Sequence, residues 1–200
     1  VKMTFTASIE DNAETKTMLG ESDEYGYRQI LWQPGDSIGL GYYSTVNKFV
    51  NTKEDSSETA IFEGEYIEQD VYYAIYPYQE GQYISWEPGY QFTLPAVQKY
   101  AEGTFAPESN VMIGKGSRGE DLKFTSVCGI LVIKLTGEEK VETISLTAKT
   151  ETGESAKLSG KFSASIDWIE SPVLTPDASA GTMITLDCKK GKGVQLDPTE

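Results

Sequence analysis

The side chains of this chain that are most able to do chemistry are carboxylates and two thiols, because histidine is absent from all 200 residues. Without imidazole, Ser-His-Asp and Cys-His nucleophiles and H-E-x-x-H zinc sites are excluded. An enzyme of this sequence would have to use carboxylates, tyrosine or lysine. Neighbouring acids such as Glu120 and Asp121 fall in expected loops, whereas glycoside hydrolysis needs two carboxylates that face each other across a cleft. We therefore predict no catalytic residue.

Ligands for a metal or a cofactor are also missing from the sequence patterns. The EF-hand pattern does not occur, and the sequence neither shows nor excludes a calcium site in a loop. GKGSRG (114–119) matches the letters of a dinucleotide fingerprint, but a strand pattern follows it instead of the helix that would hold the pyrophosphate. We interpret it as a hairpin loop and predict no metal and no cofactor.

The two cysteines are too few and too far apart for a disulfide-dense scaffold or a four-cysteine metal site. Cys128 belongs to the most apolar stretch, FTSVCGILVIKLTG (124–137), which is apolar on both sides in its middle. This pattern is typical of a central strand that is covered on both faces, where a thiol has a raised pKa and is inert. Cys188 shares an inward face with Ile184 and Leu186. A Cys128–Cys188 disulfide is a candidate that the sequence leaves open.

The segment VYYAIYPYQEGQYISWEPGYQF (71–92) is dense in aromatic residues. Such rings can stack on sugars, and Tyr78, Tyr83 and Trp86 are then the exposed members that we expect to contact a glycan. The alternative is structural, because tyrosine and tryptophan are favoured in strands and fill sandwich cores while their polar tips reach the rim.

Charge limits the partners. The chain has 31 acidic and 17 basic residues, a formal charge of −14, with the acids spread along its length. Such a surface repels polyphosphate and anionic lipid, so we expect no nucleic acid partner. The longest apolar run is far shorter than the roughly 20 residues that span a bilayer. The chain opens directly into an alternating segment, so any export signal would already have been removed.

Periodicity predicts an all-β protein. In VKMTFTASIE, Met3, Phe5, Ala7 and Ile9 alternate with polar residues, as in a half-buried strand. A long polar loop is expected at 11–26, and at most one helical turn near 97–101. We predict one domain over 1–200, a two-sheet sandwich of roughly eight to ten antiparallel strands with long loops.

Several segments together resemble the fimbrillin-like (Mfa-like) family of Bacteroidales surface proteins, which are related to type V pilins. They follow the family's order from about residue 4 to residue 196 and comprise FTAS, TKT, LWQPGDSIGL, AIFEG, YYAIYPY, LPAVQKY, FTSVCGILVIKLTG, VETISLTA, LSGKFSAS and MITLDC. The resemblance implies a transthyretin-like β-sandwich, export as a lipoprotein to the outer membrane and cell surface, and service as a fimbrial subunit or adhesin. It also implies that a closing strand or a second domain follows residue 200.

In pilins of this family, proteolysis removes the first strand, and a strand of the next subunit fills the vacated groove by β-strand addition. Carried over to this chain, the assembly strand is the one that bears Met3, Phe5, Ala7 and Ile9. Lys16 is the candidate processing residue, since it is the only basic residue between Glu10 and Arg28, although many pilins have an arginine there. The partners implied are other fimbrial subunits and a host or bacterial surface receptor or glycan.

Three hypotheses follow from these patterns. The first is a non-enzymatic fimbrial subunit or surface adhesin that assembles by donor-strand exchange. The second is a surface glycan-binding module that uses the aromatic residues of 71–92. The third and weakest is a glycosidase that works through carboxylates alone.

Overall fold

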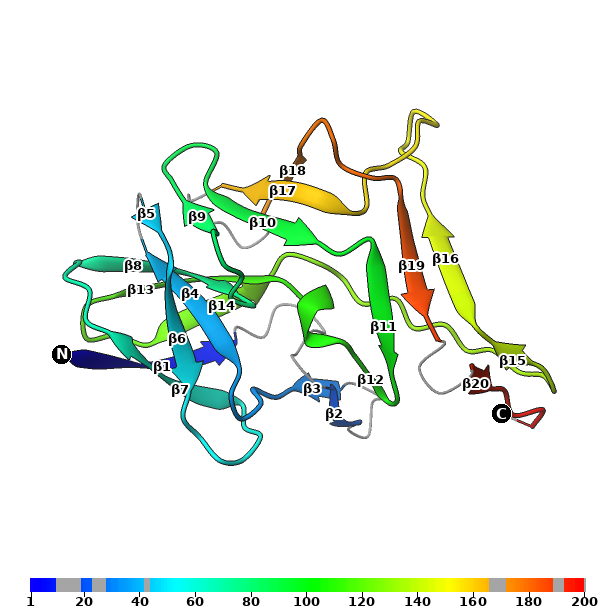
Figure 1. The fold of residues 1–200 in the computed structure, drawn as a ribbon, viewed down its shortest axis with the longest axis horizontal. Coiled ribbons are helices and arrows are strands. Elements are labelled where there is room, and N and C mark those ends of the chain that lie inside the picture. The colour runs from blue at the N-terminus through cyan, green and yellow to red at the C-terminus, as the bar shows by residue number, and fades with distance from the viewer. Residues whose placement is uncertain (10–18, 23–27, 42–43, 166–171, 189–192, 200) are drawn as a thin grey trace.

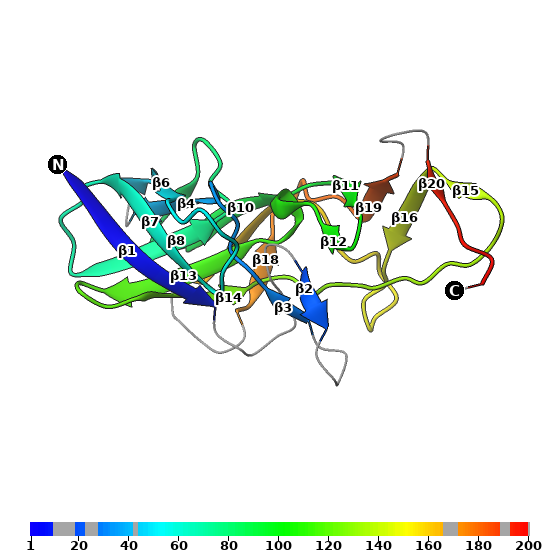
Figure 2. The ribbon, with the colours of Figure 1, turned by 90° about the horizontal axis from the view of Figure 1, so that it is seen from below.

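The computed structural model describes residues 1–9, 19–22, 28–41, 44–165, 172–188 and 193–199. The prediction of an all-β protein is confirmed, because the only helical element among these residues is the short 3-10 helix η1 (Pro107–Ser109) (Figure 1). The molecule is elongated, with the start of β1 at one end and β15 and β20 at the other (Figures 1 and 2).

A closed seven-stranded barrel occupies the end at which the chain begins. Its strands follow the spatial order β1-β14-β13-β8-β4-β6-β7. Neighbours in the barrel are antiparallel except for β1 and β14, which run parallel. The bounds are β1 (Lys2–Ile9), β4 (Ser37–Gly41), β6 (Asn47–Asn51), β7 (Thr59–Glu65), β8 (Val71–Tyr76), β13 (Met112–Ser117) and β14 (Leu122–Ser126).

Smaller sheets complete the molecule. A five-stranded sheet has the order β18-β17-β10-β9-β5, and a four-stranded sheet has the order β12-β11-β19-β16. The pairs β15-β20 and β2-β3 stand by themselves. The bounds are β2 (Leu19–Ser22), β3 (Arg28–Ile30), β5 (Ser44–Thr45), β9 (Tyr83–Ile84), β10 (Tyr90–Leu94), β11 (Val97–Ala101), β12 (Thr104–Phe105), β15 (Lys140–Val141), β16 (Thr143–Thr147), β17 (Gly160–Ala164), β18 (Leu174–Pro176), β19 (Met183–Asp187) and β20 (Val194–Gln195).

Two hydrophobic cores lie on opposite faces of β8. Tyr72, Ala74 and Tyr76 point into the barrel core, while Tyr73 and Ile75 belong to the second core. The second core is completed by residues of the five-stranded sheet, among them Ile84, Tyr90, Phe92 and Phe162. Because both faces are covered, the strand is a nearly continuous apolar run.

Buried tyrosine hydroxyls on these strands have hydrogen-bond partners. The Tyr76 hydroxyl donates to Asp36 Oδ1 at 3.1 Å, and the Tyr90 hydroxyl donates to the Gly114 carbonyl at 3.0 Å. Burial is the largest cause that raises the pKa of both phenols, and the Asp36 carboxylate adds to it at Tyr76. Both hydroxyls therefore stay protonated and act as donors.

Several expectations from the sequence are corrected by the structure. The described strands form a closed barrel with smaller sheets instead of a clear two-sheet sandwich, and two strand pairs, β1-β14 and β11-β19, are parallel. Residues 97–101 form β11 instead of a helical turn, and β2 lies within the expected loop 11–26. The expected central strand 124–137 ends at Ser126, because no strand of the described residues pairs with 127–139.

Close packing in the barrel depends on small residues. A Cβ built on Gly64 would lie 2.6–2.8 Å from ring atoms of Phe49, which is fully buried. The ring cannot move away without disturbing its core neighbours, so the site accepts only hydrogen. A Cβ on Gly129 would meet nothing within 4 Å.

We predict that Gly64→Ala lowers the free energy of unfolding by about 1–3 kcal/mol, because overpacking forces a core shift. Gly129→Ala, the control, should change it by less than about 0.5 kcal/mol. Urea unfolding followed by tryptophan fluorescence measures both. Equal stability of the two variants would contradict the packing of Phe49 on Gly64.

Candidate assembly site

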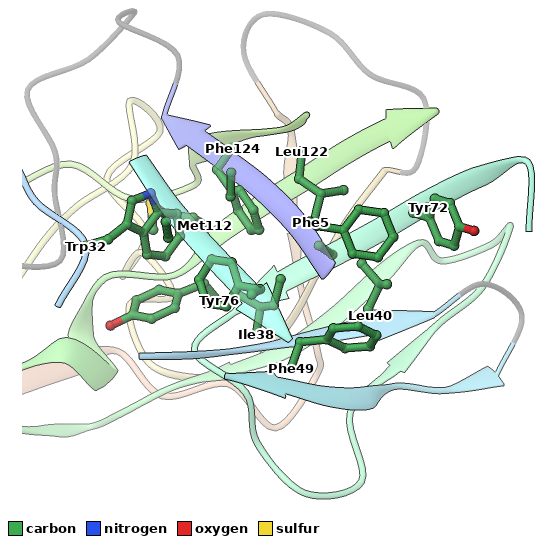
Figure 3. Packing of buried hydrophobic residues seen from close by; sticks show 14 residues of the cluster. Phe5, Trp32, Ile38, Leu40, Phe49, Tyr72, Tyr76, Met112, Leu122 and Phe124 are labelled. Atoms are coloured by element: carbon green, nitrogen blue, oxygen red, sulfur yellow. The ribbon is translucent and has the colours of Figure 1, made fainter. Parts of the chain in front are cut away.

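Strand β1 places its apolar residues in the barrel core, as its alternation predicts. Phe5 and Ala7 are buried, whereas Met3 and Ile9 are half-buried and pack against the same core. The Phe5 ring stands edge-on to Tyr72 and Phe49, with centroids at 4.7 Å and 5.9 Å. Figure 3 shows Phe5 among these rings, with Leu122 and Phe124 of β14 beside it.

One edge of β1 is fully paired. Residues 2–8 pair antiparallel with β7, in a register that sets Phe5 opposite Phe62 and Ala7 opposite Ala60. The end of the ladder is held by the Tyr66 N–H, which donates to the Val1 carbonyl at 2.9 Å. An exposed ion pair between Lys2 and Glu63 adds little to this ladder.

The other edge of β1 is paired over a much shorter length. Only residues 7–9 pair with β14, with Ala7 opposite Leu122 and Ile9 opposite Phe124. Ahead of them, residues 3–6 line a pocket of about 210 Å³ together with Tyr72 and the turn 118–121. Along the first half of β1, the strand is therefore paired on the β7 side only. We call the unpaired gap between this half of β1 and the turn 118–121 the seam.

Sequence patterns did not identify the seam. Arg118 in the turn donates from Nε to the Gln69 carbonyl at 3.1 Å and lies 3.5 Å from Asp70, so it is tied to the loop before β8. The GKGSRG match begins within β13, and its last residues, Arg118 and Gly119, form the turn of the β13-β14 hairpin. Hairpin formation could be predicted, but the offset between the turn and β1 could not.

The three aromatic residues of the glycan hypothesis differ in their surroundings. Tyr83, on β9, is 39% exposed, and Trp86, in the turn between β9 and β10, is 58% exposed. The turn is closed by the Ser85 N–H, which donates to the Gly89 carbonyl at 3.1 Å. Tyr78 packs against the second core, and Lys48 Nζ lies 5.5 Å from its ring centroid. The hairpin β9-β10 thus presents Tyr83 and Trp86, while the Tyr78 ring is largely covered.

Both cysteines are free thiols in the structure, so the candidate disulfide is not formed. Cys128 is half-buried against the second core, and Cys188 is buried beside the end of β19. Burial raises the pKa of the Cys128 thiol. At Cys188, burial and then the Asp187 carboxylate raise the pKa. These directions agree with the prediction of unreactive thiols.

The remaining expectations from the sequence concern proteolytic processing, metal ions and the membrane. Lys16, the candidate processing residue, lies outside the described residues. Within the described part of the chain, no group of three or more Cys, Asp or Glu side chains is arranged to hold a metal ion. No helix in this part is long and apolar enough to cross a membrane.

Comparison with known proteins gives no relative for this chain. No family model matches it, and neither a curated protein nor a solved structure is significantly similar.

We predict that a sample prepared without reductant titrates two thiols per chain after unfolding, as the two free cysteines require. In the native protein at pH 8, these thiols should react with Ellman's reagent at least about tenfold more slowly than after unfolding, because burial keeps them protonated. Cys128→Ser should leave a single thiol. A yield of no thiols from the unfolded chain would instead demonstrate the disulfide.

Proposed function

We propose that this protein is a non-enzymatic fimbrial subunit or cell-surface adhesin that assembles by β-strand addition. The observation that carries the proposal is the placement of β1, the first strand of the chain, in the wall of the barrel. It fills the core with Phe5 and Ala7 and is bounded on one edge by the seam. The proposal includes other fimbrial subunits as partners, a surface receptor, and an outer-membrane or fimbrial location.

The energetics of β1 support exchange better than simple loss. Withdrawing the strand would expose Phe62, Tyr72 and Leu122 and leave one edge of β7 without a partner. Burial of one phenylalanine side chain contributes about 1.5–3 kcal/mol, so an empty groove is costly. A strand with the same alternation of apolar residues restores both the burial and the hydrogen bonds, which is the physical basis of strand addition.

The family's transthyretin-like sandwich also belongs to this proposal. In a closed barrel, opposite walls face each other across one core, as the two sheets of a sandwich do. In this proposal, the two opposite walls correspond to the two sheets of the sandwich, and β1 lies between them beside the seam.

Exchange of β1 can be measured after cutting the chain behind it. A protease site inserted within residues 10–18 is cleaved in the folded protein, and a fluorescent peptide of residues 1–9 is then added. We predict uptake of the peptide by the cut protein, because the peptide can replace β1 in register. Fluorescence anisotropy and native mass spectrometry measure the uptake.

A peptide with Phe5→Asp is the matched control. It should bind about a hundredfold or more weakly, because a carboxylate would enter the core at the position of Phe5. The uncut protein should take up neither peptide. Equal uptake of both peptides, or none by the cut protein even in mild denaturant, would refute donor-strand exchange through β1.

Glycan binding is a second candidate, favoured by the exposure of Tyr83 and Trp86 on one hairpin. Aromatic faces bind the apolar faces of sugar rings, and a turn closed by hydrogen bonds keeps Trp86 in place. The charge of −14 favours neutral glycans over anionic ones.

Calorimetric titration with a panel of neutral oligosaccharides tests this candidate. We predict that Trp86→Ala weakens any observed binding about tenfold or more, since it removes the larger of the two exposed rings. Val97→Ala is the control, because Val97 is also 58% exposed but lies on β11. Heat of binding that is unchanged in the Trp86 variant would exclude this surface.

A further inference from the structure

A run of exposed apolar side chains follows β14, the last barrel strand along the chain. After β14, residues 128–136, which we call the apolar strip, cross the molecule toward β15 without joining any sheet (Figures 1 and 2). Its exposed members are Leu131 at 62%, Val132 at 73%, Ile133 at 48% and Leu135 at 45%. An exposed apolar patch of consecutive residues marks an interaction surface.

The backbone of the apolar strip is available for pairing. Among the described residues, no backbone-to-backbone hydrogen bond involves 128–136, and such bonds resume at Gly137, whose N–H donates to the Asp197 carbonyl at 3.2 Å. β-branched and aliphatic residues such as Val132 and Ile133 favour strands. The strip therefore combines strand-forming side chains with unpaired donors and acceptors, which is the template that an added strand requires.

The sequence of the apolar strip is compatible with antiparallel pairing to an identical copy. In an antiparallel pair of two identical strips centred on Val132, the two Val132 residues face each other and Leu131 of each copy faces Ile133 of the other. Lys134 faces Ile130, so the only charged residue of the strip never meets its own copy directly. Cross-strand pairs of aliphatic residues are stabilising, whereas directly opposed like charges are not.

Charge further favours this surface for contact between copies. Two chains of −14 repel each other over most of their surfaces, but no acidic residue occurs between Asp121 and Glu138. Pairing at the strip therefore brings no carboxylates into the shared ladder. A flexible side chain such as Lys134 can keep its ammonium group in water while its stem covers apolar surface.

We propose that a second copy of this chain covers the apolar strip, with two strips paired as antiparallel strands about a two-fold axis at Val132. The contact is isologous, so each strip supplies the same residues to both sides. It sets Leu131, Val132 and Ile133 of each copy against aliphatic side chains of the other and uses the free backbone groups of both strips. This inference does not depend on the proposed function, because β1 takes no part in it.

Disulfide trapping tests the register. In a Cys128→Ser, Cys188→Ser background, Val132→Cys places two thiols opposite each other, within the reach of a disulfide. We expect a covalent dimer on non-reducing gels with oxidised glutathione as the oxidant. Lys134→Cys should give at least about tenfold less dimer, because its partner is residue 130. Mixed Ile130→Cys and Lys134→Cys proteins should form the crossed dimer.

Sedimentation velocity of the full chain tests the contact without a cross-link. We expect a concentration-dependent dimer that Val132→Lys weakens about tenfold or more, because the variant sets two cations opposite each other. Thr147→Lys, on the exposed face of β16, is the control and should leave the dimer unchanged. Unchanged circular dichroism and unfolding midpoints would show that both variants fold.

Three outcomes would overturn the proposal. The first is a wild-type chain that remains monomeric at the highest soluble concentration. The second is a dimer that is insensitive to Val132→Lys, which would place the interface elsewhere. The third is faster trapping of Lys134→Cys than of Val132→Cys, which would exclude the two-fold axis at Val132.

Discussion

Strand β8 buries side chains on both faces, and the two hydrophobic cores meet through it. Tyr76 on one face stacks edge-on against Trp32 with centroids 5.4 Å apart, while Tyr73 on the other face meets Tyr90 at 6.1 Å. A change in the position of this strand would disturb both cores together. The barrel and the five-stranded sheet are therefore coupled through shared packing instead of through a hinge.

The location of β1 follows from the same core. Phe5 reaches Tyr72 of β8, so the first strand of the chain is held by the strand that organises the whole interior. On the β7 side this packing is reinforced by a full ladder, and on the β14 side it is interrupted by the seam. A strand that is held by core side chains and by one complete edge is ordered, while its other edge is left open at the seam.

Local patterns could predict the strands but not their neighbours. The alternation of Met3, Phe5, Ala7 and Ile9 predicts the inward face of β1, and burial confirms it, because period-two patterning is a local property. The parallel pairing of Ala7 with Leu122 joins residues that are far apart in sequence and has no local signal. Likewise, the two exposed rings on the β9-β10 hairpin follow from which tyrosines the second core covers, which composition cannot specify.

The contrast between 71–76 and 124–137 shows what apolar composition means physically. Both stretches are apolar on both faces, and the sequence predicts two-sided burial most clearly for the second. Two-sided burial occurs at β8, which has β4 and β13 as neighbours, whereas no described strand pairs with residues 127–139. The apolar composition of a segment sets how much free energy its burial contributes. The topology of the chain decides whether other strands of the same chain cover that segment. Where the same chain supplies no cover, the exposed side chains of Leu131, Val132 and Ile133 would gain free energy from burial against another chain. Their exposure is therefore a physical argument for such a contact.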